Sequence, residues 1–549
     1  QGAGGVMPNG PPPDRVERVR RAINTNTGGV EWPGRPGPPQ TLDTLDEEKL
    51  KELLKNNRFC RGRQRRWKYV CGSKEISEEE RGRAVELLVE TVRRLVHWYV
   101  WDVWWVGKYR KELLEIKSRA QLLNKYGDKT VNGLMRLIGK FEKYIEQLQE
   151  YWQEVGYEVR GIIDDLLNGR VEVIIRNGEG ITIYGKHLTL EANKTASSIT
   201  VQIVFRFRGI TIKTPDVLGM VMNREEYAKF LLALRLGFAV TDESVYYEGK
   251  IPQMVTTQVW QAVLWSILYP GHIYMLAHGI HVNKNGVSIE LGLRAKNYRS
   301  LKDRALEIAK ELGEDALPVF LFAAVLGDGS ALIVHKARGG VEPIICIAIS
   351  SYDFDKWESI VNRLGIRWWA PETKNSINSI YYYDNNAIDL ARRIINSLPH
   401  ALQDLLDVLS FGKWLNLKEI ARMEMKFRRG ENQIEVAGIK FSVYISEKGR
   451  SFELRHKVKS ETEIHEIINK LRSVYGEDFM VGIYESGKYT LIRIPAYIAE
   501  RYDDIKRRVI FVLCKKFMRT RDEEKRQYIA TVLRRLAPTK GAAAVRNGL

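Results

Sequence analysis

The stretch Leu321-Phe-Ala-Ala-Val-Leu-Gly-Asp-Gly329 decides the fold of the middle of this chain. It ends an apolar helical segment and places one carboxylate, Asp328, at the end of that helix. Ala323 and Ala324 are small, as two closely packed helices require, and Gly329 gives a permissive backbone for a turn into a strand. The stretch predicts a packed helix that delivers an acid. The same residues also fit a simple helix C-cap.

The order of elements after this stretch separates the two interpretations, because a C-cap predicts nothing about the residues that follow it. Hydrophobic periodicity predicts the order αββαββα from Asp315 to about Leu398. After the motif helix the expected elements are strands Ala331–Lys336 and Ile344–Ser350, helix Phe354–Leu364, strands Ile366–Trp369 and Ser379–Tyr383, and helix Ala387–Leu398.

Motif and order together resemble the LAGLIDADG homing-endonuclease module. In that family two packed helices bring two acids together over the scissile phosphates. The resemblance implies that Ala323, Ala324, Gly327 and Gly329 are motif positions and that Asp328 is catalytic and binds magnesium. A divalent metal there would activate water and stabilise the departing oxygen. The implied function is DNA binding, by a metal-dependent endonuclease or by its catalytically silent descendant.

The partner acid is less evident. The helical segment Phe411–Phe427 offers only Glu424, without a following glycine, and a solvated helix charge is the favoured alternative. Lys336 could approach a phosphate or polarise water, although a surface lysine is more common. The strand Ile344–Ser350 is apolar on both faces, whereas a sheet that reads DNA should carry polar or basic side chains on one face. These departures argue against cleavage more than against the fold.

The whole chain reads as an α+β protein of five segments. We expect a disordered Pro/Gly-rich lead at 1–40, a helical region at 41–168 and a β-rich α+β domain at 169–314. The LAGLIDADG-like module follows at 315–430, and a degenerate second repeat with a basic C-terminal helix at 431–549. The helical region should contain one long helix from Ser77 to about Leu123, with the tryptophan-rich run His97–Trp105 used for helix–helix packing.

Charge favours a polyanionic partner. The formal net charge is +18, and from Phe411 onward 30 Lys/Arg stand against 18 Asp/Glu, a net charge of +12. Each basic side chain that meets a phosphate releases counterions, so we expect nucleic acid, DNA rather than RNA. The residues most expected to touch the backbone lie along one helix and its exit: Lys506, Arg507, Arg508, Lys515, Lys516 and Arg519.

Two other basic segments have open interpretations. Arg367 precedes Trp368 and Trp369, which are either a stacking platform for a base, with Arg367 as its cation, or core residues with Arg367 on the rim. Arg58–Lys68 holds six basic residues and two aromatics. It suits phosphate contacts with an occasional stacked ring, or it is a solvated basic loop.

A second resemblance, to the PaRep group of crenarchaeal repeat-encoded proteins in its 2b branch, covers roughly Val171 to the C-terminus. It implies a multicopy, mobile gene family and nothing firm about activity. The segments that carry it are Thr214–Ala228, Asp315–Ser330, Asn386–Arg392 and Pro538–Ala544.

The cysteines and the most apolar segment limit the classes of protein to which this chain could belong. Four cysteines, Cys60, Cys71, Cys346 and Cys514, are too few for a disulfide framework, and their spacing does not favour a zinc site. The most apolar run, Leu95–Val106, is too short to span a membrane, so we expect a cytoplasmic protein. The competing hypothesis is a non-enzymatic interaction protein with a self-associating helical region and loose RNA or DNA binding.

Overall fold

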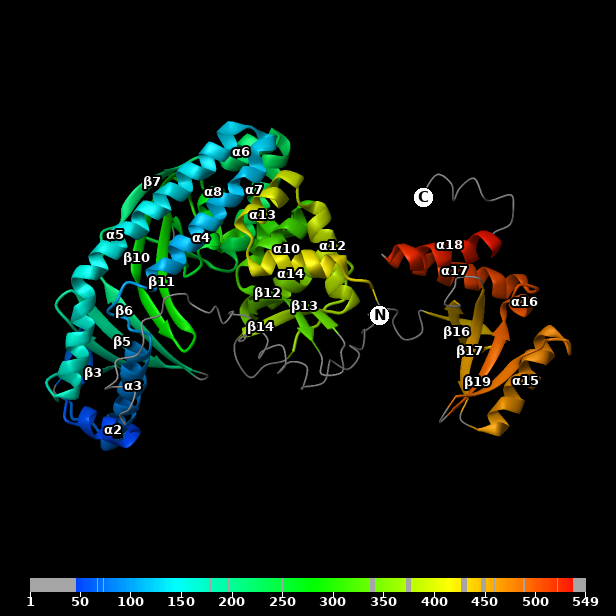
Figure 1. Ribbon diagram of the computed structural model, residues 1–549, viewed down its shortest axis with the longest axis horizontal. Helices are drawn as coiled ribbons and strands as arrows, with labels where there is room; N and C mark the ends of the chain where they lie inside the picture. The colour runs from blue at the N-terminus through cyan, green and yellow to red at the C-terminus, as the bar shows by residue number, and fades with distance from the viewer. Residues whose placement is uncertain are drawn as a thin grey trace. The chain divides into compact units, whose positions relative to one another are not determined.

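The computed structural model describes residues 46–536, except 67, 73, 177–179, 196–197, 248–249, 336–340, 372–376, 426–431, 446–450, 459, 487–488 and 521. The predicted lead at 1–40 therefore lies outside the described residues. The chain forms two compact units (Figure 1). The first is Gln1–Tyr383 with Leu390–Lys418, and the second is Asp384–Asp389 with Glu419–Leu549. Both units mix helices with antiparallel sheet, in agreement with the expected α+β class.

An eleven-stranded sheet forms the frame of the first unit. Its order is β2-β1-β3-β4-β5-β6-β10-β11-β9-β8, and β7 also pairs with β10. Only the β1–β3 pairing is parallel among the described strands. The strands are β1 (Arg58–Arg65), β2 (Lys68–Cys71), β3 (Glu172–Arg176), β4 (Gly180–Tyr184), β5 (Leu188–Lys194), β6 (Ile199–Phe205), β7 (Ile210–Thr214), β8 (Glu243–Tyr246), β9 (Ile251–Thr256), β10 (Gly271–Asn283) and β11 (Gly286–Ala295).

Helices from the predicted helical region pack onto this sheet. They are α2 (Glu47–Lys55), α3 (Glu78–His97), α4 (Val106–Arg119), the 3-10 helix η1 (Ala120–Tyr126) and α5 (Asp128–Leu167). The expected single helix from Ser77 to Leu123 is thus broken. The break holds the tryptophan-rich run, where Trp105 is fully buried and packs edge-on against Trp152 of α5. Packing between α3, α4 and α5 separates the segment into two helices, which periodicity alone did not show.

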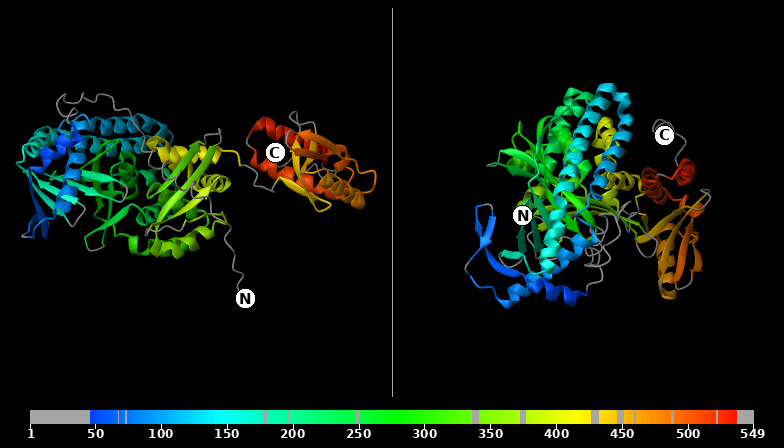
Figure 2. Two further views of the ribbon diagram at one scale, coloured as in Figure 1. Left: turned by 90° about the horizontal axis from the view of Figure 1, so that it is seen from below. Right: turned by 60° about the vertical axis from the view of Figure 1, so that its left-hand side comes forward.

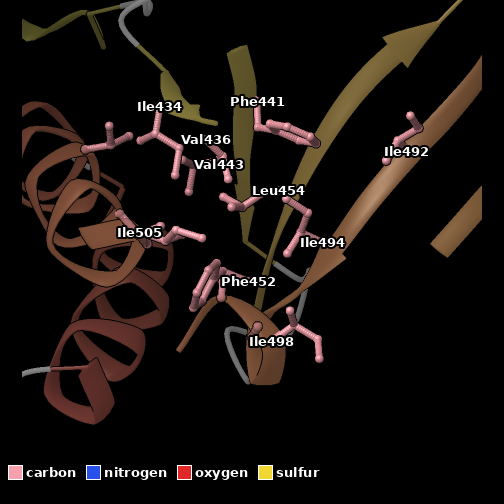
Figure 3. Close-up of a cluster of buried hydrophobic side chains, with 14 of the residues drawn as sticks. Ile434, Val436, Phe441, Val443, Phe452, Leu454, Ile492, Ile494, Ile498 and Ile505 are labelled. Carbon is pink, nitrogen blue, oxygen red and sulfur yellow. The ribbon is translucent and has the colours of Figure 1, made fainter. Parts of the chain in front are cut away.

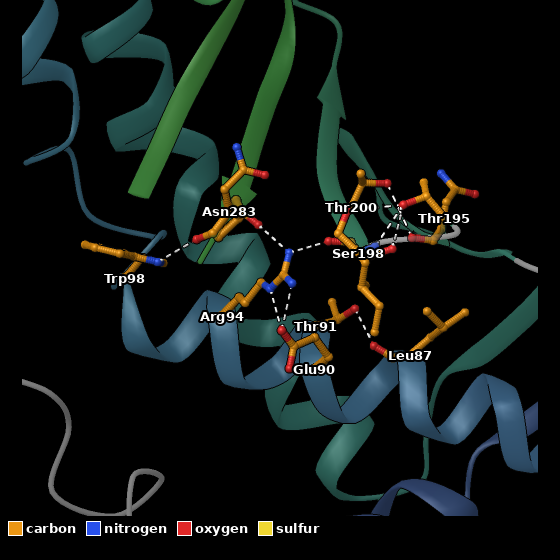
Figure 4. Close-up of polar contacts among 12 residues, drawn as sticks. Leu87, Glu90, Thr91, Arg94, Trp98, Thr195, Ser198, Thr200 and Asn283 are labelled. Atoms are coloured by element: carbon orange, nitrogen blue, oxygen red, sulfur yellow. Dashed lines mark hydrogen bonds and ion pairs between the residues drawn. The ribbon is translucent and has the colours of Figure 1, made fainter. Parts of the chain in front are cut away.

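Polar contacts fix α3 against the sheet (Figure 4). The buried Arg94 guanidinium donates to the carbonyl oxygen of Ile199 at 2.6 Å and pairs with Glu90 one turn earlier. The Trp98 indole donates to the carbonyl oxygen of Asn283 at 2.9 Å. In α5, the Tyr144 hydroxyl accepts from the amide of Ala277 on β10. These contacts hold the helices on the sheet of their own unit, while Leu114, Leu122 and Tyr157 stay exposed, so self-association of the helical region stays a prediction.

Two successive αββαββα repeats follow, and all of their elements except the first residues of α12 belong to the first unit. The first is α7 (Arg224–Ala239), β8, β9, α8 (Val259–Leu268), β10, β11 and α9 (Ala305–Lys310); the short α6 (Val217–Val221) precedes it and η2 (Lys302–Arg304) precedes α9. The second is α10 (Ala316–Leu326), β12 (Gly329–His335), β13 (Val341–Ser350), α11 (Phe354–Asn362) after η3 (Ser351–Asp353), a bridge at Trp369, β14 (Ile377–Tyr383) and α12 (Asn385–Ser397).

Strand order shows that these repeats share one topology. In the first repeat the strands lie side by side in the order β8-β9-β11-β10. In the second, β12, β13 and β14 are neighbours and Trp369 pairs with Tyr381 of β14, which places the four segments in the same relative order. The duplicate of the motif-bearing module therefore lies before it in the chain, inside the segment expected to be a separate α+β domain. Helices α13 (His400–Leu409) and α14 (Gly412–Arg422) follow the second repeat.

The second unit has its own sheet and core (Figure 3). Strands β15 (Gln433–Val436), β16 (Ile439–Ile445), β17 (Phe452–Val458), β18 (Gly482–Ser486) and β19 (Tyr489–Pro495) form an antiparallel sheet in the order β15-β16-β17-β19-β18. Its helices are α15 (Glu461–Tyr475), α16 (Ala496–Ala499), α17 (Asp503–Arg519) and α18 (Glu523–Leu536). Phe441, Leu454 and Ile494 meet Ile505 of α17 in the core. The order β16-β17-β19-β18 is the same as the strand order of the two repeats in the first unit.

Two further observations concern the cysteines and the membrane. Cys60 and Cys71 form a disulfide, a pairing that was not expected from four scattered cysteines. It arises because β1 and β2 fold into a hairpin that brings the two residues together, with Cα atoms 5.4 Å apart. Within the described part of the chain, every helix is too short or too polar to cross a membrane.

Candidate active site

The site is built where α7 crosses α10. Both helices carry a small residue five positions before an aspartate, Gly237 before Asp242 and Ala323 before Asp328. At the crossing the backbones nearly touch, because a Cβ atom on Gly237 would lie 2.5 Å from the carbonyl oxygen of Phe320. Gly237 and Ala323 therefore set the close approach that small residues permit between helices.

The helix ends beyond this crossing are equally tight. A Cβ atom on Gly327 would lie 2.7 Å from Cβ of Thr241, so Gly327 and Thr241 pack against each other just before the two acids. Thr241 is itself buried, and its hydroxyl donates to the carbonyl oxygen of Gly237 at 2.8 Å. The close crossing consequently leads both chains out of their helices side by side.

An acid pair results. The carboxyl groups of Asp328 and Asp242 lie within hydrogen-bonding reach of each other, although 86 residues separate them in sequence (328 − 242). The pKa of Asp328 is raised to about 6, first by partial burial and then by the hydrogen bond to Asp242 and its charge. The Asp328 side chain still reaches solvent. Two carboxylates this close resist being ionised together, which is the condition that a divalent cation would relieve.

Three further side chains surround the pair. The buried Gln261 of α8 donates from its amide nitrogen to the Asp242 carboxylate. Lys413 of α14 donates to the carbonyl oxygens of Leu326 and Gly327 at 2.7 and 2.6 Å, at the end of α10. Burial lowers the pKa of Lys413, whereas Asp242 and Asp328 oppose that shift. Lys302 donates to the carbonyl oxygen of Glu243 and is the other cation that favours ionised Asp328.

Behind Asp242 lies a buried acid. Glu243 is completely inaccessible to solvent, and one of its carboxyl oxygens accepts from the Tyr269 hydroxyl at 2.7 Å and the Trp265 indole at 3.3 Å. Its other oxygen has no partner. Burial raises the pKa of Glu243 to about 7, against the opposing hydrogen bonds and the charge of Lys302. Glu243 thus occupies the position where the second repeat has Gly329.

The two repeats present different sheet faces next to the acids. On the first, Arg294 of β11 lies over the Tyr246 ring at 3.7 Å and donates to the Gln253 side chain at 2.9 Å. Lys296 lies over the ring of Tyr274 at 4.7 Å. This face has the donors and cations suited to base edges and phosphates.

The face of the second repeat is apolar. Ile344 and Cys346 of β13 lie between Leu332 on one side and the stacked rings of Tyr381 and Tyr383 on the other, and Trp369 packs against both rings. The opposite face of β13 is buried under helices. Strand Ile344–Ser350 is therefore buried on both sides, which explains its uninterrupted apolar sequence.

The other residues expected at the site have the following places. Glu424 belongs to the second unit, where it is exposed and lies 3.9 Å from the Lys525 ammonium. Within the first unit the carboxylate beside Asp328 is Asp242, because α7 is the helix that crosses α10 closely enough to bring its terminal acid there. Lys336 lies outside the described residues. Arg367 is exposed, Trp368 is half-buried and Trp369 packs into the aromatic cluster, so both interpretations of Arg367 stay predictions.

The basic residues of α17 are partly engaged. Lys516 donates to the carbonyl oxygen of Val443 at 3.3 Å, and burial lowers its pKa. Arg508 donates to the carbonyl oxygen of Glu435, and Lys515 lies over the Phe511 ring at 4.4 Å. Arg507 is exposed, whereas Lys506 and Arg519 are half-buried. The arc is therefore less uniform than its sequence pattern indicated, and phosphate contact by these residues remains a prediction.

Sequence reasoning missed Asp242, Gln261, Lys302 and Lys413. Asp242 had a detectable pattern, since Leu236-Gly-Phe-Ala-Val-Thr-Asp242 aligns with Phe322-Ala-Ala-Val-Leu-Gly-Asp328, with a small residue and an acid at the same spacing. The pattern was obscured because Thr241 and Glu243 replace the two glycines. Strands β8 and β9 after it were also not anticipated. Gln261 and the two lysines have no local pattern, because they come from later elements.

Comparisons with known proteins give structural neighbours only. No family model matches the sequence, and no curated protein matches it. Full-length WhiA from Thermatoga maritima is 14% identical with a TM-score of 0.21, and the match covers 35% of this chain and 59% of WhiA. The LAGLIDADG meganuclease I-AabMI bound to uncleaved DNA is 10% identical with a TM-score of 0.14, over 40% of this chain and 97% of its own. The homing endonuclease I-LtrWI bound to target DNA is 14% identical with a TM-score of 0.13, over 43% and 99%.

Proposed function

We propose that the first unit is a DNA-binding module of LAGLIDADG type that cleaves phosphodiester bonds with a divalent metal. The observation that carries the proposal is the Asp242–Asp328 pair at the ends of two packed helices. The chain's own duplicated topology and this acid pair support the proposal. Membership of the PaRep group is part of the same proposal and rests on the sequence resemblance alone.

The residues present fit a hard divalent cation. Asp242 and Asp328 offer carboxylate oxygens, the ligand type that Mg²⁺ prefers, and their mutual repulsion favours a cation between them. Magnesium would lower the pKa of a bound water and neutralise charge on the phosphate. The Gln261 amide holds the Asp242 carboxylate in place, and the Lys413 contacts fix the end of α10 and supply a positive charge beside both acids.

The binding surface next to these acids is asymmetric. The first repeat offers Arg294, Gln253 and Tyr246 at its sheet face, whereas the second offers an apolar aromatic cluster. We infer that phosphate and base contacts concentrate on the first repeat. DNA is favoured over RNA because a sheet face with extended side chains suits a wide major groove, whereas the deep, narrow groove of an RNA helix excludes them.

The test compares wild type with Asp242→Asn and Asp328→Asn in nuclease assays with Mg²⁺ and with Mn²⁺ on a broad pool of duplex DNA. Each substitution keeps the shape and removes the charge that holds the metal, so cleavage should vanish while DNA binding survives or tightens. Asp315→Asn is the matched control, because Asp315 lies at the other end of α10 and pairs with Lys229; it should cleave normally. If wild type and both variants are equally inactive on the pool and bind DNA alike, the protein binds without cleaving.

A further inference from the structure

The hairpin β1–β2 is a rigid, two-faced structure at the edge of the large sheet, opposite to the edge formed by β8. Its strands pair Gly62 with Cys71, Arg63 with Val70 and Arg65 with Lys68. The Cys60–Cys71 disulfide closes its base, and the parallel pairing of β1 with β3 anchors it to the sheet. Figure 2 shows the hairpin, in blue, at the sheet edge in the right-hand view.

One face of the hairpin packs on the sheet. A Cβ atom on Gly62 would lie 2.8 Å from Cγ2 of Ile174, so the strand rests directly on β3. The Tyr69 amide donates to the Tyr184 hydroxyl at 2.8 Å, and the Arg176 guanidinium lies 5.6 Å from the centre of the Tyr69 ring. These contacts fix which side of the hairpin faces outward.

The outward face is basic. Arg63 and Arg65 are exposed on it and Arg66 is exposed at the turn; Lys68 is also exposed, with its ammonium 5.8 Å from the centre of the Tyr184 ring. The sequence from Arg58 to Cys71 contains no acid. Neighbouring acids pair only with the base of the hairpin: among the described residues, Glu172 lies 3.6 Å from Arg58, and Glu80 pairs with Arg61.

We propose that this outward face, Arg63, Arg65 and Lys68, binds the phosphate backbone of a DNA duplex. The choice of DNA rests on the proposed function; the need for a polyanion rests on the hairpin alone. Guanidinium groups pair with phosphate oxygens in a fork geometry, and a strand presents alternate side chains on one face. β2 and β8 form opposite edges of the sheet, so the hairpin contacts are separate from those at the acid pair. They strengthen binding without specifying sequence.

The test uses the full chain and a mixed-sequence duplex, with affinity measured by fluorescence anisotropy over a range of salt concentrations. The triple variant R63A/R65A/K68A should bind at least about tenfold more weakly at moderate salt, and its log–log salt slope should be shallower by about 2 to 3, since each lost phosphate contact removes about 0.9. The charge-preserving variant R63K/R65K should keep a salt slope near that of wild type, because the slope follows the number of charges, and should lose some affinity, because lysine lacks the fork. Thermal melts should be unchanged, because the altered side chains are exposed.

The matched control is K129A/K140A/K143A, which removes the same charge from exposed positions of α5; its slope should stay near that of wild type. Equal losses in the two triple variants would show a general charge effect and overturn the proposal. The proposal would also be overturned if R63A/R65A/K68A bound DNA like wild type and lost binding only to anionic lipid vesicles in a parallel sedimentation assay. The proposal is separable from catalysis, because Asp328→Asn should abolish cleavage and keep the steep slope, whereas the hairpin variant should lose slope even if no nuclease activity exists.

Discussion

At the residue scale, Glu243 shows how burial creates a pH dependence. Its folded-state pKa is about 7 against an ordinary 4.5, so the folded protein holds a proton that the unfolded chain releases. Unfolding free energy should therefore fall as pH rises from about 4.5 through 7, by about 3 kcal/mol at high pH, since each unit is worth about 1.4 kcal/mol. Glu243→Gln keeps the hydrogen-bond acceptor and removes the titration.

The measurement is urea unfolding of wild type and Glu243→Gln across this pH range. The difference between the two isolates Glu243 from other groups; it should grow in favour of the variant from about pH 4.5 to pH 7 and stay constant above that. Parallel pH profiles for the two proteins would mean that Glu243 titrates normally.

Gly237 gives a second test at this scale. A side chain there would run into the backbone of α10, so Gly237→Val should force the helices apart and cost about 1 to 3 kcal/mol or more. Gly161→Ala in α5 is the matched control, because nothing lies near its Cβ position. That variant should be neutral or gain up to about 1 kcal/mol from helix propensity. Chemical denaturation measures the free energy of unfolding of both variants. Equal changes in that free energy would mean that Gly237 does not lie at a tight helix crossing.

At the element scale, the basic residues of α17 are of two kinds: some stabilise the fold, and others are exposed and available to bind nucleic acid. The Lys516 ammonium donates a hydrogen bond to the carbonyl oxygen of Val443, whereas the Arg507 side chain is exposed to solvent. Lys516→Ala should lower unfolding free energy by about 1 kcal/mol through a lost hydrogen bond and lost stem packing. Arg507→Ala should leave stability unchanged and reduce nucleic-acid affinity. Melting curves and anisotropy titrations on both variants check this. If neither variant loses affinity for nucleic acid, α17 has no role in binding.

At the scale of the whole molecule, the second unit should act independently. Its core of Phe441, Leu454 and Ile494 packed on α17 is complete within the unit. Its chain from residue 431 to the end carries 24 Lys/Arg against 16 Asp/Glu, a net charge of +8. A fragment that begins at residue 431 leaves out Phe411, whose ring stacks on Trp260 of the first unit at 3.8 Å.

We expect that fragment to unfold cooperatively and to bind nucleic acid with an affinity that falls steeply with salt, because binding would release counterions. Calorimetry and salt-dependent anisotropy are the measurements. Binding that is flat from low to high salt would exclude an electrostatic interface in this unit, and a broad, non-cooperative melt would show that its core depends on the rest of the chain.

The sequence by itself determined the elements that local patterns encode. The small residues Ala323 and Ala324, the acid Asp328 and the alternating strands after it predicted the second repeat, and the apolar spacing after residue 431 predicted its degenerate relative. These patterns suffice because side-chain period reports which face of a helix or strand is buried.

Only the tertiary structure decided that α7 crosses α10 closely, and hence that Asp242 lies beside Asp328 within the first unit. Likewise, Gln261, Lys302 and Lys413 converge on the pair from separate elements, and the Cys60–Cys71 disulfide depends on hairpin pairing. Such pairings are set by long-range packing between elements. The spacing of residues along one helix or strand does not specify which other element packs against it.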